Sequence, residues 1–352
     1  MNVVPLPDYL PVLGICGFSD SGKTTLIEQA IPLLLQKKLR LAVVKHDAHR
    51  VDCDRPGKDS DRFFQAGADV YVNGDQSFSR GHPPGVCSFQ QFLVCLACQY
   101  DLVLVEGYKH SPLPKIWLTG ADHGPPPDDL ENLLAVYPRD STRLARLCEF
   151  IDGWLETRMR RQPLYACILL GGQSRRMGTP KHLLTTDGWK TWLQKISEIL
   201  ADAADRVFLA GTGAVPDHLR DLPRFPDIPH CSGPLSGIIS VMRWQPTANW
   251  LVVGCDMPLL SLEAVRWLLG QRRPGLWGTM PMLDRDRPEP LLALYDGRLL
   301  SCLEDLTRQP LPRITLLADH EKISRPIVPD HLKTSWTNIN TPEELARLSK
   351  RK

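Results

Sequence analysis

Two stretches of the sequence combine glycines with cations in the manner of phosphate-binding loops. The first, "GFSDSGKT" at 17–24, fits the pattern G-x-x-x-x-G-K-[ST]. In this pattern backbone N–H groups surround the phosphates, the lysine reaches the outer phosphates and the final hydroxyl holds Mg²⁺. We assign these last two roles to Lys23 and Thr24; the alternative is a chance match, and Asp20 must point away from any phosphate. The other expected nucleotide contacts of this loop are Gly17, Ser21, Gly22 and Thr25.

The second loop, "ILLGGQSRRMGTPKHLL" at 168–184, has a different pattern. Gly171 and Gly172 let the backbone approach a phosphate closely, because they carry no side chain. In nucleotidyl transfer an incoming phosphate attacks the α-phosphorus, and negative charge gathers on the leaving pyrophosphate. Cations that are already in place lower that barrier. The candidates are Arg175, Arg176 and Lys181, and we take Arg175 and Lys181 as catalytic.

An acidic residue follows a strand-like run in each half of the chain. Glu106 ends "LVLVE" and suits a Walker-B-like partner for the metal, or it caps the next turn. Asp256 follows "VVGC", and a carboxylate at the carboxyl end of a parallel strand lies where open α/β sheets bind ligands. It is therefore a candidate Mg²⁺ ligand, or else the cap of a helix from Ser261. Asp227, before "GPLSG", either accepts hydrogen bonds from guanine or caps a turn.

Two further groups of residues have weaker patterns. His46, His49 and Cys53, with the acidic Asp52 and Asp54, include possible metal ligands, but their spacing fits no standard zinc site, and we favour a substrate-facing loop. Cys95 and Cys98 form a C-x-x-C inside an apolar helical stretch without a second pair. We interpret both as core thiols.

Composition limits the classes of function. The length of 352 residues favours two domains, and 43% hydrophobic residues are enough for a core in each. A net charge of +2 argues against a general nucleic-acid binder. We find no secretory signal and no membrane-spanning run, and ten scattered cysteines are typical of reduced thiols in a cytoplasmic protein.

Strands and helices alternate twice along the chain, which predicts mainly parallel sheets covered on both faces. In the first half we expect strands at 12–16, 41–44, 69–72, 101–106 and 133–137. The helices expected there lie after Gly22, with a bend at Pro32, and at 90–99 and 143–160. In the second half the strands are 165–170, 206–210 and 250–256, and the helices are 191–203 and 261–269. Thr341 and Glu344 form a capping box for a last helix.

The basic run before Pro163 is the best boundary, so we expect domains at 1–160 and 164–352. We expect both to be three-layer α/β/α domains, the first a P-loop NTPase-like domain and the second a Rossmann-like nucleotidyltransferase domain.

The first half resembles the molybdopterin-guanine dinucleotide biosynthesis adaptor family, MobB. The segments that carry the resemblance are "GFSDSGKTTL", "VKH", "DRPGKDS…QAGAD" and "LVLVEGYKH". The resemblance covers residues 10–158. It implies a GTP-binding accessory domain with weak GTPase activity, and pairing of two copies through this domain.

The second half resembles the molybdenum cofactor guanylyltransferase family, MobA, over residues 164–350. The matching segments are "LLGGQSRRMGTPKHLL", "GPLSG", "CDMP", "RPEPLLALY" and "NINTPEEL". One departure is Pro180 before the loop lysine, where the family commonly has an acidic residue. Another is the lack of a clear counterpart to the family asparagine in "GTGAV". The resemblance implies GTP contacts from Leu169, Leu170, Gly171, Gly172 and Lys181, nucleotide binding by Asp227, nucleotide and Mg²⁺ binding by Asp256, and a pterin side at Asn338 and Asn340.

Together the two resemblances imply a multifunctional fusion. The second domain joins GMP from GTP to Mo-molybdopterin and releases pyrophosphate, while the first assists. The implied partners are these small molecules, molybdopterin-insertion proteins and molybdoenzyme chaperones, with no nucleic acid and no membrane. The alternatives are a cytidylyltransferase or sugar-phosphate nucleotidyltransferase of the same fold, or a non-catalytic pterin cofactor carrier.

Overall fold

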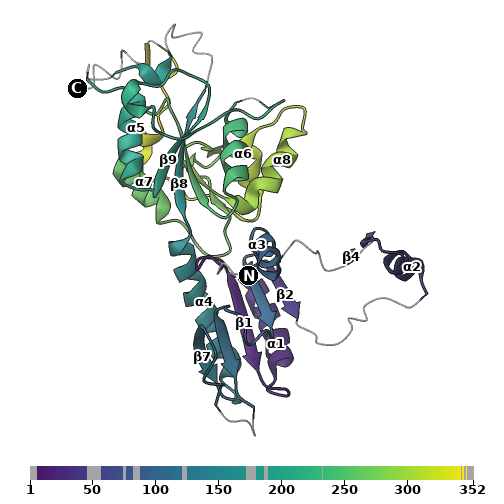
Figure 1. Ribbon diagram of the computed structural model, residues 1–352. Helices are drawn as coiled ribbons and strands as arrows, with labels where there is room; N and C mark the ends of the chain where they lie inside the picture. Colours follow the sequence, from purple (N-terminus) through teal and green to yellow (C-terminus); the bar gives the residue numbers. More distant parts are fainter. Residues whose placement is uncertain are drawn as a thin grey trace. The chain divides into compact units, whose positions relative to one another are not determined.

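The computed structural model describes residues 6–45, 57–73, 77–81, 88–120, 125–171, 180–185, 189–231, 233–341, 343–344 and 346. The chain divides into two compact units, residues 1–152 and 153–352. This division falls within one continuous helix, α4 (Arg143–Arg161), a few residues before the boundary expected from the sequence. Each unit has its own sheet and its own core (Figure 1).

The sheet of the first unit has five parallel strands in the order β2-β5-β1-β6-β7. The strands are β1 (Val12–Gly17), β2 (Leu41–Lys45), β5 (Leu102–Glu106), β6 (Lys115–Leu118) and β7 (Leu133–Tyr137). Besides α4, the helices that pack on this sheet are α1 (Lys23–Gln36), which contains Pro32, and α3 (Phe89–Ala97). The expected parallel α/β architecture is therefore confirmed.

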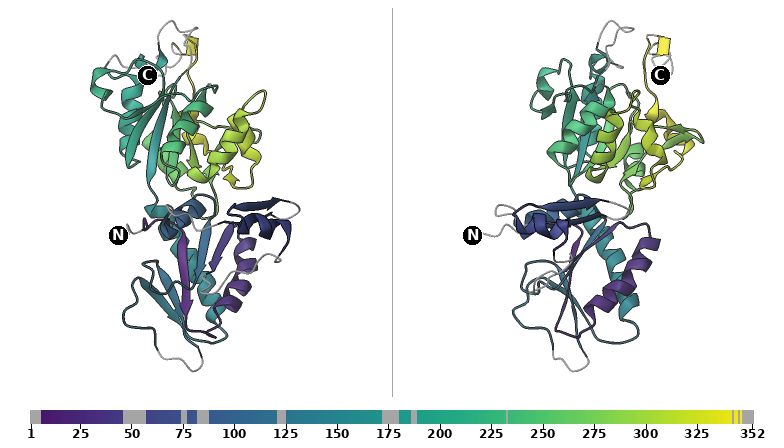
Figure 2. Two further views of the ribbon diagram at one scale, coloured as in Figure 1. Left: turned by 45° about the vertical axis from the view of Figure 1, so that its right-hand side comes forward. Right: turned by 90° about the vertical axis from the view of Figure 1, so that its right-hand side faces the viewer.

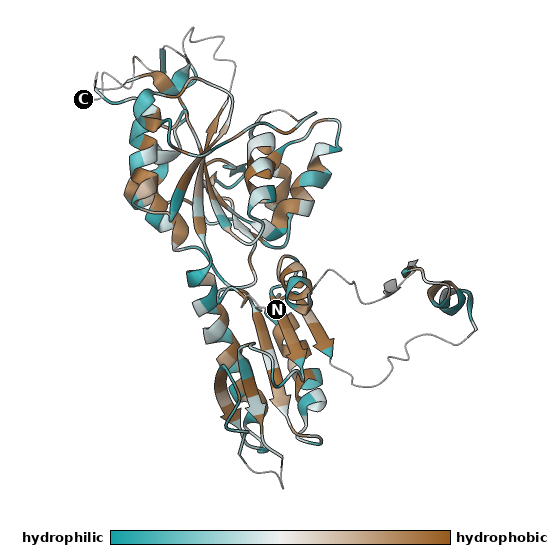
Figure 3. Cartoon of the chain, in the orientation of Figure 1, coloured by the Kyte–Doolittle hydropathy of each residue, from teal (hydrophilic) through white to brown (hydrophobic). Residues whose placement is uncertain are grey.

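Both faces of this sheet are covered. On one face Val12 and Val103 pack with Leu93 of α3. Leu13 and Ile15 point to the opposite face, because side chains alternate along a strand, and both are fully buried. The strands are accordingly apolar along much of their length (Figure 3).

Two features of the first unit differ from the sequence prediction. The strand expected at 69–72 forms as β3 (Val70–Asn73), but it pairs with β4 (Ser77–Arg80) in a separate two-stranded sheet after the short helix α2 (Asp59–Gln65). Strand β6 was not predicted, although it lies next to β1. It is only four residues long, and it begins with a lysine that directly follows a proline.

The second unit has a seven-stranded sheet in the order β10-β9-β8-β11-β15-β12-β16. Strands β8 (Leu164–Leu170), β9 (Arg206–Gly211), β10 (Arg224–Phe225) and β11 (Asn249–Gly254) are parallel to their neighbours in this group. Strand β15 (Ala293–Asp296) runs antiparallel to β11, and β12 (Gly278–Thr279) and β16 (Ile323–Ser324) extend the sheet. A small hairpin of β13 (Met282–Asp284) and β14 (Arg287–Pro288) lies outside it. The sheet is thus parallel from β10 to β11 and mixed from β11 to β16.

Helices lie on both faces of this sheet (Figures 1 and 2). Cys167 and Leu169 of β8 pack in the cluster that contains α6 (Pro234–Trp244) and α8 (Leu300–Thr307). Ile168 and Leu170 pack in the cluster that contains α5 (Trp192–Ala201) and α7 (Leu262–Leu269). The 3₁₀ turns are η1 (Lys181–Leu183), η2 (Asp217–Leu219), η3 (Gly297–Leu299), η4 (Ile314–Asp319) and η5 (Asp330–Trp336).

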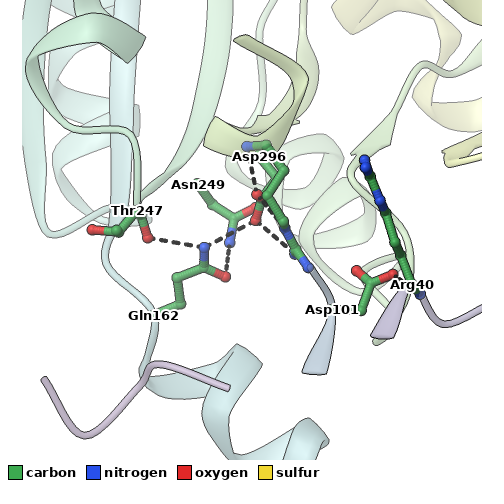
Figure 4. A network of polar contacts seen from close by, with 7 residues as sticks. Arg40, Asp101, Gln162, Thr247, Asn249 and Asp296 are labelled. Atoms are coloured by element: carbon green, nitrogen blue, oxygen red, sulfur yellow. Dashed lines mark hydrogen bonds and ion pairs between the residues drawn. The ribbon is translucent and has the colours of Figure 1, made fainter. Parts of the chain in front are cut away.

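A polar network closes the amino-terminal end of this sheet (Figure 4). Gln162, just after α4, donates through Nε2 to the carbonyl of Thr247 (3.0 Å) and to Oδ2 of Asp296 (2.9 Å). Asn249 donates through Nδ2 to Oε1 of Gln162 at 2.6 Å. In the first unit, Asp101 accepts from the backbone N–H of Arg40 at 2.8 Å. These contacts lie at the ends where the parallel strands begin. They therefore do not occupy the carboxyl ends, where open α/β sheets bind ligands.

No helix in the described part of the chain is both long enough and apolar enough to cross a membrane.

Candidate nucleotide sites

The first candidate site is the loop between β1 and α1. Lys23 turns back over this loop, and its amine donates to the carbonyls of Gly17 (3.2 Å) and Phe18 (2.8 Å). Gly22, directly before α1, has φ +85°, which glycine adopts without strain. The strand, loop and helix follow one another in the order that the P-loop pattern requires. The Lys23 amine thus lies over the loop, where it would contact the phosphates of a bound nucleotide.

The loop is tightly closed around Ser21. A Cβ at Gly17 would lie 2.6 Å from the carbonyl oxygen of Leu118, so no larger residue fits there. Ser21 is fully buried, and its hydroxyl has no hydrogen-bond partner in the described structure. A buried hydroxyl without a partner is uncommon, because it loses the hydrogen bonds that it makes to water. The Ser21 hydroxyl, which can both donate and accept a hydrogen bond, therefore lies unused next to Gly17.

Glu106 and Thr24 meet across two neighbouring strands. Glu106 is the last residue of β5, is buried, and accepts a hydrogen bond from the hydroxyl of Thr24 at 2.8 Å. Its register partner on β1 is Ile15, so strand pairing brings the carboxylate to the phosphate loop. The carboxylate thus contacts the proposed metal-binding hydroxyl. Thr25, the residue after Thr24, lies in the first turn of α1 and is exposed.

A buried arginine holds the base of this loop. Arg143 begins α4, is 6% exposed, and donates from Nη1 to the carbonyl of Ser21 at 2.8 Å. Its other donors reach three carbonyls just beyond β6 and at the end of β7: Thr119 (2.6 Å), Tyr137 (3.0 Å) and Pro138 (2.6 Å). One guanidinium therefore joins the phosphate loop to the segments that follow two other strands. This role could not be predicted from local patterns, because the arginine lies 122 residues from Ser21.

The second candidate site lies at the carboxyl ends of β8 and β11 in the second unit. The amine of Lys181 is 3.4 Å from Oδ2 of Asp256, and it also donates to Oδ1 of Asn340. Both charged side chains are largely enclosed, with exposed fractions of 17% and 22%. The backbone N–H of Ile339 donates to the carbonyl of Asp256 at 3.0 Å. Three distant parts of the sequence thus meet at Asp256.

Two observations explain the orientation of Asp256. Strand β11 ends at Gly254, where a Cβ would lie 2.8 Å from Oδ1 of Asp256. Helix α7 is capped by Ser261, whose hydroxyl accepts from the N–H of Ala264 at 3.2 Å. Asp256 is therefore not the cap of α7, and its carboxylate is available to a ligand.

The remaining predicted residues surround this pair in different ways. The side chains of Leu169 and Leu170 are buried in the core, so only their backbone is available at the sheet edge, where Gly171 has open space in place of a side chain. Asp227 lies in the exposed loop before α6. Oδ1 of Asn338 is buried without a hydrogen-bond partner in the described structure, and such an acceptor suits a ligand that donates hydrogen bonds.

A buried thiol lies beside each site. Burial raises the pKa of Cys16, at the end of β1, to about 11, and it does the same for Cys255, directly before Asp256. Both thiols therefore stay protonated near neutral pH and are poor nucleophiles. Among the other cysteines, Cys95 and Cys98 are free thiols, but Cys95 is exposed rather than in the core as predicted. It faces solvent because it lies on the outer side of the short helix α3.

Several predicted residues lie outside the described part of the chain: Gly172, Arg175, Arg176, His46, His49, Asp52, Cys53 and Asp54. Within the described residues, no group of three or more His, Cys, Asp or Glu side chains could hold a metal ion. The expected capping box is present, since Glu344 accepts from the N–H of Thr341 (3.1 Å) and donates its own N–H to the Thr341 hydroxyl (3.2 Å).

Two protein-family models match the chain. Residues 12–138 match the family described as molybdopterin guanine dinucleotide synthesis protein B. Residues 166–323 match the MobA-like NTP transferase domain. Each match contains the phosphate loop of its own half.

Individual proteins match the same two halves. A molybdopterin-guanine dinucleotide biosynthesis adapter protein from Haemophilus influenzae is 38% identical over 44% of this chain and 94% of its own length. A "Probable molybdenum cofactor guanylyltransferase" from Pelotomaculum thermopropionicum is 30% identical over 51% of this chain and 89% of its own length. A molybdenum cofactor biosynthesis bifunctional protein from Synechocystis sp. is 32% identical over 53% of this chain, and the match spans 54% of that protein.

Proposed function

The chain belongs to the molybdopterin guanine dinucleotide synthesis protein B family through residues 12–138 and to the MobA-like NTP transferase family through residues 166–323, and we propose that it is a two-domain molybdenum cofactor guanylyltransferase. The observation that carries the proposal is the meeting of Lys181 and Asp256, 3.4 Å apart, at the carboxyl ends of β8 and β11. The sheet order changes direction between these two strands, and open α/β sheets bind nucleotides at such a point.

The reaction is transfer of GMP. An oxygen of the terminal phosphate of Mo-molybdopterin attacks the α-phosphorus of GTP and forms a new phosphoanhydride bond. The bond from the α-phosphorus to the β-phosphate oxygen breaks, and pyrophosphate leaves with the electron pair. The protein contributes placement and charge rather than covalent chemistry, as in other phosphoryl transfers.

Lys181 supplies the fixed positive charge for this step. Its amine lies beside Asp256 in an enclosed site, where charge is screened less than in water. Placed on the phosphates of GTP, it offsets the negative charge that gathers on the leaving group. Arg175 adds a second cation from the same loop, and Asp227 accepts from the guanine edge. Asn338 and Asn340 face the pterin.

The residues fit the Mg²⁺ that both motifs imply. Magnesium sites commonly use one or two carboxylates together with phosphate oxygens. Asp256 offers one carboxylate in the second unit, and Glu106 with the Thr24 hydroxyl offers the matching set in the first. When bound, the ion would neutralise phosphate charge; Asp256 would hold it in the transferase site, and Thr24 with Glu106 in the GTP-binding site.

The first unit acts as a GTP-binding accessory domain with weak GTPase activity. Lys23 and Thr24 hold the phosphates and their metal ion, and Glu106 lies ready to orient the ion or its water. The fusion raises the effective concentration of one domain near the other. Pairing of two chains through this unit, contacts with molybdopterin-insertion proteins and molybdoenzyme chaperones, and a cytoplasmic location remain parts of the proposal.

The alternatives are less well supported. Several relatives are named as probable molybdenum cofactor guanylyltransferases rather than as cytidylyltransferases or sugar-phosphate enzymes. A carrier without turnover would not need a lysine and an aspartate held together in one enclosed site.

The decisive experiment is incubation of the purified chain with GTP, Mg²⁺ and Mo-molybdopterin. Mass analysis should detect the guanine dinucleotide, and a coupled assay should detect one pyrophosphate for each dinucleotide. CTP added at equal concentration should compete poorly. Formation of a cytosine dinucleotide in preference, or no dinucleotide at all from folded protein, would contradict the proposal.

A further inference from the structure

His182 is the only buried residue of η1, the single turn that carries Lys181. It is 5% exposed, and its Nε2 lies 2.7 Å from the carbonyl oxygen of Ala214, in the loop after β9. A carbonyl only accepts hydrogen bonds, so Nε2 carries the proton and donates it. Burial lowers the pKa of His182, which favours this neutral, donating ring at neutral pH.

The loop that receives this hydrogen bond is itself fixed at its start. Gly211 has φ +101°, and a Cβ there would collide with the carbonyl of Leu170 at the end of β8. Arg224 donates to the carbonyl of Gly211 from Nε (2.9 Å) and Nη2 (2.8 Å). Gly211 also pairs in register with Leu170, so the start of the acceptor loop is fixed beside the strand, β8, that leads into the second phosphate loop.

The loop is also shaped for the imidazole ring. A Cβ at Gly213 would lie 3.0 Å from Cε1 of His182, so glycine leaves the space in which the ring packs. A cavity of about 330 Å³, lined by Leu209, Ala214, Val215 and Arg224 among others, borders the same loop. The hydrogen bond from His182 to Ala214 and the packing of its ring on Gly213 therefore join this loop to η1.

The end of η1 has a second anchor. The N–H of Trp192, at the start of α5, donates to the carbonyl of Leu184 at 2.9 Å. This bond, together with the bridge between Thr185 and Thr191, fixes where the turn ends. The side chain of His182, one residue from Lys181, supplies a second point at which the turn is held. The Lys181 amine itself bonds Asp256 and Asn340, so these two anchors orient the turn that carries the amine.

We propose that His182 is a positioning residue for guanylyl transfer, which holds η1 against the Gly213–Ala214 loop so that the Lys181 amine stays beside Asp256. This inference rests on the proposed function for its kinetic consequence, but not for its structural one. In the described part of the chain, the His182 ring bonds the carbonyl of Ala214 and not the Lys181 amine. Its contribution is geometric, and displacement of a catalytic group by about 1 Å can reduce turnover by roughly a hundredfold.

A matched pair of substitutions tests this role. In His182→Gln the amide Nε2 can reach the position of the imidazole Nε2, whereas the shorter amide of His182→Asn cannot. Both substitutions are polar and uncharged, so they differ mainly in whether the bond to Ala214 forms. His218→Asn, at an exposed histidine of η2, is the control for histidine replacement in the neighbouring segment.

Two measurements read the outcome. In guanylyl transfer we expect kcat of His182→Asn to fall roughly tenfold to a hundredfold with little change in KM for GTP, and His182→Gln to stay within about threefold of wild type. In the nucleotide-free protein, acylation of the Lys181 amine by a succinimidyl ester, followed by mass spectrometry, should be faster in His182→Asn and unchanged in His182→Gln. The control should match wild type in both.

The results separate the two hypotheses. If wild type transfers GMP but His182→Asn has wild-type kcat and wild-type Lys181 labelling, the positioning role is wrong. If Asn and Gln impair turnover equally, the hydrogen bond is not the cause and the role is likewise wrong. If wild type makes no dinucleotide, the proposed function fails, while the labelling comparison still decides whether His182 positions Lys181.

Discussion

The strongest test of the transferase site is Lys181→Met, because it should change two measurable quantities in opposite directions. Methionine is close to lysine in length but has no charge. The substitution therefore removes the cation that we assign to the leaving phosphates. It also removes the partner of Asp256 in the nucleotide-free protein, where the amine and the carboxylate are 3.4 Å apart.

The magnitudes follow from that distance and from the burial of the pair. At 3.4 Å two unit charges attract by about 5 kcal/mol at an effective dielectric constant of about 20. Desolvation and side-chain ordering cancel most of this, and a net coupling of about 1 kcal/mol remains for such a pair. A divalent ion that competes with the lysine for Asp256 should then bind about fivefold more tightly after the substitution. Loss of a preorganised charge at the leaving group should lower kcat by about 10²–10³-fold.

The assay uses Mn²⁺ as a spectroscopic probe for the Mg²⁺ site and dinucleotide formation for turnover. To report only on the second unit, metal binding is measured in a Thr24→Ala background, which removes the hydroxyl that we assign to the metal in the first unit. Lys190→Met is the matched control, since Lys190 pairs with Glu198 on an exposed surface of the same unit. We expect the control to keep wild-type turnover and metal affinity.

Lys181→Met with kcat within about threefold of wild type would refute the charge assignment, whatever the metal affinity. Reduced turnover together with weakened Mn²⁺ binding would refute the competition argument. In that case the lysine would support the metal site instead of occupying it.

Three further outcomes are expected. Lys23→Ala should abolish GTP hydrolysis by the first unit and leave basal guanylyl transfer intact, as measured by phosphate and dinucleotide release in parallel; loss of both activities would mean that the units are obligately coupled. Arg143→Met removes the charged donor shared by four carbonyls, of which that of Ser21 is buried, so calorimetry should show the first unit destabilised by about 3 kcal/mol and the second unchanged. Burial lowers the pKa of His182 below its ordinary value of 6.5, so its neutral form stabilises the fold fully above that pH and progressively less as pH falls. The melting temperature of the second unit should therefore drop more between pH 7 and pH 5 in wild type than in His182→Gln, and equal drops would contradict this.

The phosphate loops and their acids could be predicted from the sequence because each motif is local. Glycines, a lysine and a hydroxyl occur within eight residues in "GFSDSGKT", and the strand that precedes each acid is an unbroken apolar run. Strand pairing then brings loop and acid together, as for Ile15 and Glu106. The parallel order of strands around β1 and β8 follows from the same alternation of strands and helices.

Strand β6 could not be predicted in this way. It begins with Lys115, which is fully buried, and its amine donates to the carbonyls of Ser111 (2.5 Å) and Glu131 (2.7 Å). A lysine normally indicates a solvent-exposed position, and only the finished fold supplies acceptors for its protons. Gly14 on β1 makes room for it, since a Cβ there would lie 3.1 Å from that of Lys115.

The supporting residues of the two sites were missed for a related reason. Arg143 and His182 act through carbonyl groups far away in sequence, Ser21 for the first and Ala214 for the second. A backbone carbonyl is present at every residue, so the type of the acceptor residue carries no signal. Such contacts can be inferred only when the spatial neighbours are known.

The two sites share an arrangement that bears on how they bind nucleotide. In each, the group assigned to phosphate or metal contacts the acid of the same site: Thr24 bonds Glu106, and Lys181 pairs with Asp256. Each contact joins the segment that follows one strand to the acid at the carboxyl end of the neighbouring strand. The ligand-binding groups are therefore held in place before any ligand arrives. The ligand must then replace these contacts rather than add to them. A triphosphate that takes the lysine while its metal ion takes the carboxylate satisfies both charges at once, whereas either component alone leaves the other charge without its ion-pair partner. Metal and nucleotide should therefore bind the second unit cooperatively, and this follows from the pairing of Lys181 with Asp256 alone.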